Sequence, residues 1–288
     1  MKRIGFMIDT SADMPEELIE KYDLKKVNFI VNFDDEGFVA HEEISNEEFY
    51  AKIRETGIHP KTAQTPYQTL YDALLENAKE CETLIFYTLS SKASGQYQTA
   101  TLIAKELMEE NPELDIRVVD TQKFSMYIGM AVIKAYELAQ QGASADEIIE
   151  KSLEHINQYE VYLIVDDLNY LAKGGRLKKT TAIIGTMLDI KPVLGIVDGL
   201  IEPLANLRGK KKIYKKLVEM VKESDGFNPD NTDMMIIHSN EVYANELHTA
   251  LAEEFGDEKI TAHIEIGPII GTHTGPGAVA VVFRKECL

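Results

Sequence analysis

The sequence is poor in cysteine and has no long hydrophobic run. Cys81 and Cys287 are its only cysteines, and they fit no metal-ligand or Cys-x-x-Cys spacing. We therefore expect free thiols in a reducing cytoplasm and no metal site. The apolar stretch after Arg3 ends at Asp9, which is too short for a secretory signal. No run approaches the roughly 20 apolar residues of a spanning helix. These absences predict a soluble, cytoplasmic protein with no membrane insertion.

Positive charge is also scarce. The chain has 30 Lys and Arg residues against 48 Asp and Glu residues, a formal net charge of −18. Such a surface repels phosphate backbones and anionic membranes, which argues against a nucleic-acid partner. An anionic ligand would have to be held by local donors. No Gly-x-x-x-x-Gly-Lys-Ser/Thr loop and no Gly-x-Ser-x-Gly elbow occurs, which argues against a kinase and against a common class of hydrolase.

The first half of the chain alternates short β-rich runs with helical patterns, and this alternation is typical of a parallel sheet covered by helices on both faces. We expect a domain at residues 1–159 with this α/β/α architecture. The expected strands are 4–9, 27–33, 84–89 and 116–120, and the expected helices are 15–22, 46–56, 67–81, 95–111, 125–141 and 145–159.

The second half predicts a different α/β domain, at residues 160–288, with a mixed or antiparallel sheet and helices on one side. Asp198-Gly199 is a hairpin signal between two of its strands. The expected strands are 161–165, 192–197, 201–207, 233–238, 260–266 and 279–284, and the expected helices are 168–172, 182–188, 210–224 and 241–255.

One polar segment, residues 90–97, lies between an expected strand and the helix that follows it. Ligands of open parallel sheets bind beyond the carboxyl ends of the strands, and a helix start offers unpaired N–H groups. Ser94 adds a hydroxyl, and Gly95 lets an anion approach the backbone. The alternative is that Ser94 only caps the helix.

A second polar turn, residues 61–66, also leads into a helix. Pro66 suits the first helical turn, which makes Thr65 the expected N-cap. Thr62 and Gln64 have no such local role, so they are candidates for ligand contact. The alternative is that this turn only caps the helix that follows it and contacts no ligand.

A third segment, residues 271–278, places one histidine among three glycines and a proline. This composition predicts a tight loop that presents His273 for function, whereas the other six histidines are expected to be structural. Gly174 is the expected C-cap of the 168–172 helix. Arg208, before the basic run 210–216, could complete an anion site.

These segments together resemble the DegV family of fatty-acid-binding proteins. The resemblance rests on Thr-Ala-Gln-Thr-Pro at 62–66, Ser-Gly-Gln-Tyr at 94–97, Val-Asp-Thr at 119–121, Leu-Ala-Lys-Gly-Gly-Arg at 171–176 and Gly-Thr-His-Thr-Gly-Pro-Gly at 271–277. It implies two α/β domains with a long-chain fatty acid, such as palmitate, in a tunnel between them. The carboxylate would be held by Thr62, Ser94 and Gly95, with His273 and Arg208 organising the hydrogen bonds.

The resemblance also implies a carrier and not an enzyme, with no catalytic residue and no cofactor besides the bound fatty acid. In bacterial relatives such a carrier serves lipid transport or fatty acid metabolism and presents the carboxylate to a separate fatty acid kinase. Two alternative uses of these site residues remain open, and an interaction module that acts through the basic run 210–216 is a third alternative, which can coexist with the carrier role. One is an acyl hydrolase that uses Ser94, His273 and an acid such as Asp9 or Asp120. The other is a binder of a small phosphate ligand at the same helix start.

Overall fold

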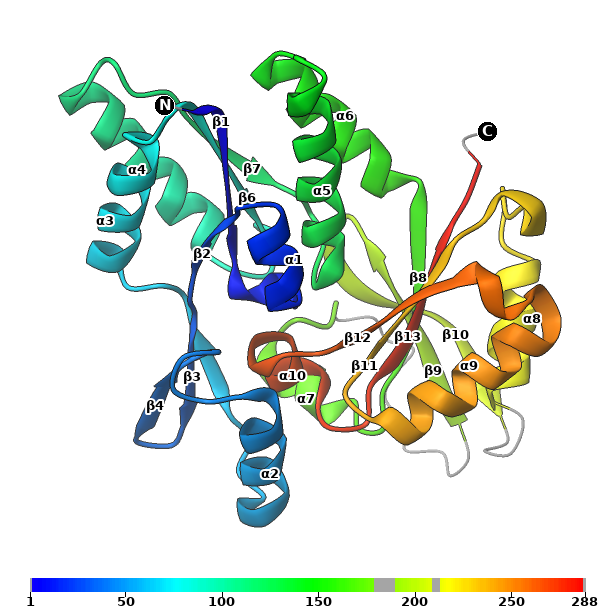
Figure 1. Ribbon diagram of the computed structural model, residues 1–288. Helices are drawn as coiled ribbons and strands as arrows, with labels where there is room; N and C mark the ends of the chain where they lie inside the picture. Colours follow the sequence, from blue (N-terminus) through cyan, green and yellow to red (C-terminus); the bar gives the residue numbers. More distant parts are fainter. Residues whose placement is uncertain (1, 179–189, 209–212, 287–288) are drawn as a thin grey trace. The chain divides into compact units, whose positions relative to one another are not determined.

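The computed structural model describes residues 2–178, 190–208 and 213–286 (Figure 1). The chain divides into two compact units: unit 1 comprises Met1–Ile156 with Gly267–Ile270, and unit 2 comprises Asn157–Ile266 with Gly271–Leu288. Each unit is described by itself below. No helix in the described ranges is long and apolar enough to cross a membrane. The expected helix at 182–188 and Lys210–Lys212 lie outside these ranges.

Unit 1 is built on a parallel sheet with the strand order β2-β1-β6-β7. Successive residues of a strand face opposite sides, so Met7 and Phe86 contribute to the core beneath α3 and α4. Tyr87 faces the other side, where its hydroxyl lies 2.7 Å from Ser152 Oγ of α6. The expected parallel sheet with helices on both faces is confirmed. Its strands are β1 (Lys2–Asp9), β2 (Lys25–Val27), β6 (Cys81–Thr88) and β7 (Ile116–Asp120).

The helices of unit 1 follow the predicted pattern closely. Ser45 and Glu48 form a capping box at the start of α2, and Gly57, with φ 67°, ends this helix. Tyr159 was expected in the last helix of this half but begins a strand of unit 2. The helices are α1 (Glu16–Lys21), α2 (Asn46–Thr56), α3 (Tyr67–Ala78), α4 (Gln96–Glu110), α5 (Met126–Gln140) and α6 (Ala145–Asn157).

A small antiparallel sheet, ordered β4-β3-β5, was not predicted. The expected single strand at 27–33 is wrong, because β2 ends at Val27 and β3 begins at Ile30 in this second sheet. Between them the Phe29 N–H donates to Thr10 Oγ1 at 3.0 Å, so the chain leaves the parallel ladder there. The new strands are β3 (Ile30–Phe33), β4 (Glu36–Val39) and β5 (Lys61–Ala63).

Unit 2 contains a six-stranded mixed sheet with the order β10-β9-β8-β13-β11-β12. Only β11 and β12 pair in parallel among these described strands. Asp198 and Gly199, with φ values of 48° and 74°, form the predicted hairpin between β9 and β10. The strands are β8 (Tyr159–Ile164), β9 (Ile190–Val197), β10 (Leu200–Arg208), β11 (Met234–His238), β12 (Ile260–Glu265) and β13 (Val279–Arg284).

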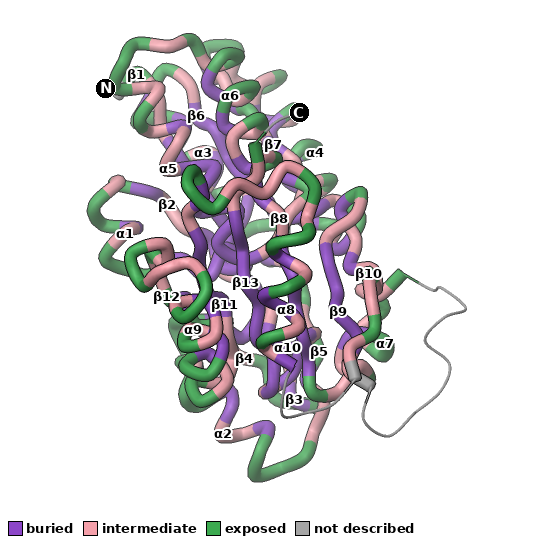
Figure 2. Tube along the Cα trace, turned by 90° about the vertical axis from the view of Figure 1, so that its right-hand side faces the viewer, coloured by how far each residue is buried: buried purple, intermediate pink, exposed green. Residues whose placement is uncertain are grey.

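The core of unit 2 lies between its sheet and α8 and α9. Leu217 and Leu247 from these helices join Phe283 of β13 in one buried cluster, and β13 is buried almost throughout (Figure 2). The mixed sheet predicted for this half is confirmed. The helices of unit 2 are α7 (Asn169–Gly174), α8 (Ile213–Lys222), α9 (Glu241–Phe255) and α10 (Pro268–Thr274), whose first three residues belong to unit 1.

Candidate functional site

The start of α4, beyond the carboxyl end of β6, has open hydrogen-bond donors. Gly95 is the N-cap residue, and Ser94 Oγ accepts the Gln96 N–H at 3.2 Å. Ser94 therefore does help to cap the helix, as the alternative held. Within the described ranges, the N–H groups of Gly95, Tyr97 and Gln98 and the hydroxyl proton of Ser94 find no acceptor. These donors can receive an anion, and the helix dipole favours one there.

The 61–66 segment packs directly on this helix start. A Cβ on Gly95 would lie 2.9 Å from Gln64 Oε1, and Gln64 Nε2 donates to Thr99 Oγ1 of α4 at 3.0 Å. Thr62 lies beside them in β5, half-buried and paired with Val31. The structure thus brings together the segments of Thr62, Ser94 and Gly95, which the sequence had singled out separately.

Thr65 anchors the same segment instead of capping α3. The expected Thr65 N-cap is wrong, because the N-cap is Pro66, which makes no side-chain cap. The Thr65 N–H donates to Gln96 Oε1 at 3.2 Å, and Gln96 Nε2 donates to Thr65 Oγ1 at 3.0 Å. Both residues are fully buried. This reciprocal pair holds the polar turn against α4.

A buried acidic cluster lies at the end of β1; the sequence reasoning considered its Asp9 only as the acid of a hydrolase and did not recognise the cluster. Asp9 is fully buried and accepts hydrogen bonds from the Ser11 N–H at 3.0 Å, from the Ser11 hydroxyl and from the Leu89 N–H. Burial raises its pKa to about 6, against the opposing effect of these donors. The signal was the run Asp-Thr-Ser-Ala-Asp directly after a buried strand, where polar residues at a sheet edge indicate a site.

Asp13 and Asp120 shape the surrounding backbone. Asp13 Oδ2 accepts from Ser125 Oγ at 2.5 Å, and its Oδ1 accepts from the Gly267 N–H at 2.9 Å. Asp120 Oδ1 accepts from the N–H of Ser91 at 3.0 Å. Asp9 and Asp120, the acids proposed for a hydrolase, are therefore already bonded to backbone N–H groups. Their arrangement orders the loops around the start of α4.

The second set of candidate residues lies in unit 2, where α7 and α10 meet. A Cβ on Gly174 would overlap the His273 imidazole and lie 3.2 Å from its Cε1 atom. Burial, and then the nearby Arg176 guanidinium, lower the pKa of His273 to about 4. The imidazole is therefore neutral at pH 7 and can both donate and accept a hydrogen bond. Two of the segments that carry the family resemblance, 171–176 and 271–277, pack against each other here.

The glycines around His273 follow from close packing. The expected loop at 271–278 is wrong in part, because Gly271 to Thr274 continue α10 and only the following residues are irregular. Gly275 has φ 77°, and a Cβ there would lie 2.7 Å from the Tyr170 ring. Gly174 is likewise not the C-cap, since Gly175, with φ 70°, occupies that position.

Two residues that the sequence reasoning did not select hold this turn. Ser239 Oγ donates to Gly275 O at 2.9 Å and accepts from the Ala278 N–H at 2.8 Å. The Asp166 N–H donates to Gly277 O at 3.1 Å. Arg208 is the remaining residue predicted to hold the carboxylate. It ends β10, and its side chain lies outside the described part of the chain.

The arrangement in each unit suits recognition of a single carboxylate. Unit 1 offers a hydroxyl and unpaired N–H groups at a helix start, and unit 2 offers a neutral imidazole beside a guanidinium. Within the described ranges, no three His, Cys, Asp or Glu side chains could hold a metal ion together. Hydrogen-bond donors of this kind stabilise a buried anion, and they need no cofactor to do so.

Comparisons with known proteins agree with this class of two-unit α/β protein. A sequence model described as "Uncharacterised protein, DegV family" matches residues 3–286. A fatty acid-binding protein of Thermotoga maritima is 32% identical over 96% of each chain. The crystal structure of a fatty acid binding DegV family protein from Streptococcus agalactiae superposes with a TM-score of 0.86 at 31% identity, covering 100% of both chains. One from Thermus thermophilus gives 0.85 at 28% identity, covering 99% of this chain and 100% of that one. The chain belongs to the DegV family.

Proposed function

We propose that this protein binds one long-chain fatty acid, such as palmitate, as a carrier. The observation that carries the proposal is the open start of α4, where the Ser94 hydroxyl and the Gly95 and Tyr97 N–H groups have no acceptor among the described residues. The fatty-acid-binding names of the similar proteins from Thermotoga maritima and Streptococcus agalactiae support the choice of ligand.

In this proposal the carboxylate is held by Thr62, Ser94 and Gly95 of unit 1 and by His273 and Arg208 of unit 2. The acyl chain occupies a tunnel between the two domains, taken as residues 1–159 and 160–288. Each buried methylene contributes about 0.8 kcal/mol, so the tail supplies most of the affinity. The head-group donors fix orientation and offset the cost of taking a carboxylate out of water.

Isothermal titration of delipidated protein with palmitate tests the proposal. Ser94→Ala should weaken binding by about tenfold, because it removes a charge-assisted hydrogen bond. Thr101→Ala is the matched control, since Thr101 lies within α4 but its hydroxyl is exposed and donates to Tyr97 O at 2.7 Å. Equal affinities for the two variants would contradict the assignment of Ser94.

We also propose that the bound carboxylate is presented to a separate fatty acid kinase in the cytoplasm, and that this chain itself catalyses no step. The kinase would transfer the γ-phosphoryl group of ATP to a carboxylate oxygen, giving an acyl phosphate and ADP. Hydroxylamine traps acyl phosphates as hydroxamates, so the test incubates loaded protein, ATP and candidate kinases. Hydroxamate formed without any kinase would contradict the carrier role.

A further inference from the structure

The edge of the parallel sheet in unit 1 is an open groove along β7. The strand is the last in the order β2-β1-β6-β7 among the described residues. A cavity of about 700 Å³ lies over it, bordered by Tyr97 and Met108 of α4 and by Ile149 and Leu153 of α6. All four of these side chains are half-buried. The groove therefore combines a strand that has no neighbour on its outer edge, among the described residues, with partly exposed apolar walls.

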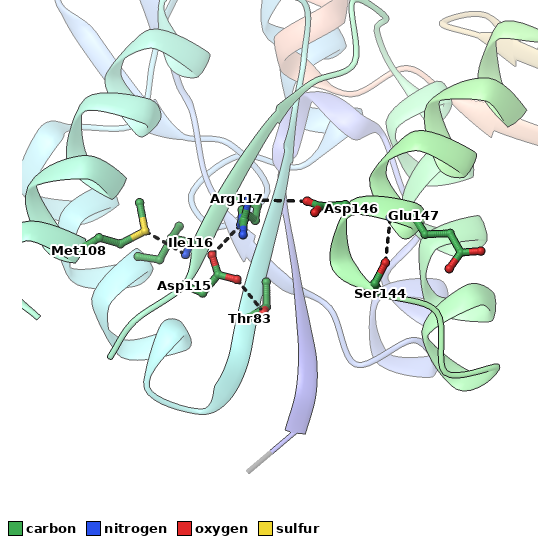
Figure 3. Close-up of polar contacts among 8 residues, drawn as sticks. All are labelled: Thr83, Met108, Asp115, Ile116, Arg117, Ser144, Asp146 and Glu147. Atoms are coloured by element: carbon green, nitrogen blue, oxygen red, sulfur yellow. Dashed lines mark hydrogen bonds and ion pairs between the residues drawn. The ribbon is translucent and has the colours of Figure 1, made fainter. Parts of the chain in front are cut away.

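The outward backbone groups of β7 are poorly satisfied. In a parallel ladder, alternate residues bond to the neighbouring strand, and the Leu84 N–H of β6 donates to Asp115 O at 2.8 Å. The backbone N–H and C=O groups of residues 116 and 118 therefore point away from β6. The outward Ile116 N–H donates to Met108 Sδ at 3.4 Å (Figure 3). A thioether is a weak acceptor on a flexible side chain, and a partner's carbonyl would replace it readily.

The groove is acidic. Asp115 and Asp120 line it with a single cation, Arg117. Arg117 is already paired with Asp115 at 2.6 Å and with Asp146 of α6 at 3.7 Å, as Figure 3 shows. The Asp146 side chain is 86% exposed, and Glu150, one helical turn further on, is exposed too. The unbalanced charge along the groove is negative.

We propose that β7 binds an extended, lysine- or arginine-bearing segment of a partner protein by strand addition. Main-chain hydrogen bonds to residues 116 and 118 would provide the pairing, and alternate apolar side chains would contact the walls of α4 and α6. A second copy of this chain is disfavoured, because it would bring another acidic groove and a net charge of −18. The inference does not depend on fatty acid binding, although Tyr97 lines the groove with its side chain and also belongs to the start of α4.

The probe is a fluorescein-labelled, end-blocked peptide of eight residues that alternates lysine with valine, followed by fluorescence anisotropy with the full-length protein. A second peptide with prolines in place of the valines has the same charge but cannot form a strand. We expect the first peptide to bind at least about tenfold more tightly than the second. Equal binding of the two would show that charge alone attracts them and would overturn the proposal.

Two variants locate the binding. Val118→Pro removes an outward N–H at an edge position that tolerates proline. It should weaken binding of the lysine–valine peptide about fivefold to tenfold. Glu150→Lys reverses a charge beside the groove and should also weaken binding of this peptide. Glu55→Lys makes the same charge change on α2 and should leave peptide binding unchanged. Equal effects of the two lysine variants would refute the location.

Amide hydrogen exchange on the wild-type protein keeps the test independent of how the variants fold. The Val118 amide should exchange quickly in the free protein and be protected when the lysine–valine peptide is bound. Unchanged exchange at Val118 with bound peptide would overturn the proposal. So would a dimer of the free protein in which this amide is already protected, since a second copy would then occupy the edge.

Discussion

The imidazole of His273 lies directly against the backbone of Gly174. A Cβ at position 174 would overlap the ring, with Cε1 only 3.2 Å away. The neighbouring Gly175 has no atom within 4 Å of its own Cβ position but has φ 70°. Two adjacent glycines thus serve different purposes, since the first makes room for the histidine and the second permits the left-handed end of α7.

Gly174→Ala and Gly175→Ala should therefore both destabilise unit 2, for different reasons. The first introduces an overlap costing about 1–3 kcal/mol, and it should move the His273 ring. The second costs about 1–2 kcal/mol of left-handed strain and should leave the ring in place. The His273 side-chain NMR signals and the unfolding midpoints separate the two effects. A His273 signal that is unchanged in Gly174→Ala would contradict the packing described above.

The His273 imidazole should titrate near pH 4. Burial is the larger cause and the Arg176 guanidinium the smaller one. Because the folded pKa lies below the unfolded value of about 6.5, the neutral ring contributes stability above pH 6.5, and this contribution is lost as the pH falls toward 4. Arg176→Gln should raise the pKa while leaving it below 6.5. Titration by NMR of the ligand-free protein measures this, and a wild-type value near 6.5 would be inconsistent with a buried ring.

Asp9 should make the stability of the fold depend on pH in the opposite direction from His273. Its pKa is raised to about 6 by burial, so its protonated form is favoured in the fold. The associated stability is fully present below the unfolded pKa of about 3.9 and is lost as the pH rises through 6, with about 3 kcal/mol at stake. Denaturant unfolding at pH 5 and pH 8 should show a smaller difference for Asp9→Asn than for wild type. The exposed Asp35→Asn should leave the difference unchanged, and an Asp9→Asn difference as large as that of wild type would count against the raised pKa.

The contact between Gly95 and Gln64 predicts a coupled pair of substitutions. Gly95→Ala places a methyl group 2.9 Å from Gln64 Oε1, while Thr99 holds the Gln64 amide through a bond of 3.0 Å. The substitution should cost about 1 kcal/mol and weaken palmitate binding. In a Thr99→Val background Gln64 can move, so the same change should cost less. A double-mutant cycle on unfolding free energy measures the coupling, and additive effects would contradict it.

Regular elements with strong patterns could be predicted from the sequence. The expected α2, β7, α9 and β13 agree with the structure residue for residue. Each has a periodic apolar face or a short buried run with clear ends, such as the capping box at Ser45. Local chemistry determines such elements, so one sequence is enough to locate them.

The missed elements depend on distant partners. β5 has only three residues, with both end residues exposed, and it becomes a strand by pairing with β3. The break between β2 and β3 depends on Thr10, nineteen residues away from Phe29 along the chain. Neither feature leaves a periodic signal, since alternation appears only where a strand has one buried face over several residues.

The sequence identified separate segments of the candidate site but not the contacts that join them. Ser94, Gly95 and Thr62 were chosen from polar turns before helices, and their segments do pack together in unit 1. Asp13 was overlooked, and Asp9 was considered only as the acid of a hydrolase, because buried carboxylates look like ordinary surface acids in a chain with 48 Asp and Glu residues. Their role depends on donors from Leu89 and Gly267, which only the folded chain brings near.

The most direct test of the central claim is native mass spectrometry of the purified protein, with lipid extraction and identification of what is released. We predict one fatty acid per chain in the wild type, retained in Thr101→Ala and lost in Ser94→Phe, whose side chain would fill the start of α4. A wild-type protein that carries no lipid and does not take up added palmitate would contradict the claim. So would a Ser94→Phe protein that keeps its full complement of fatty acid.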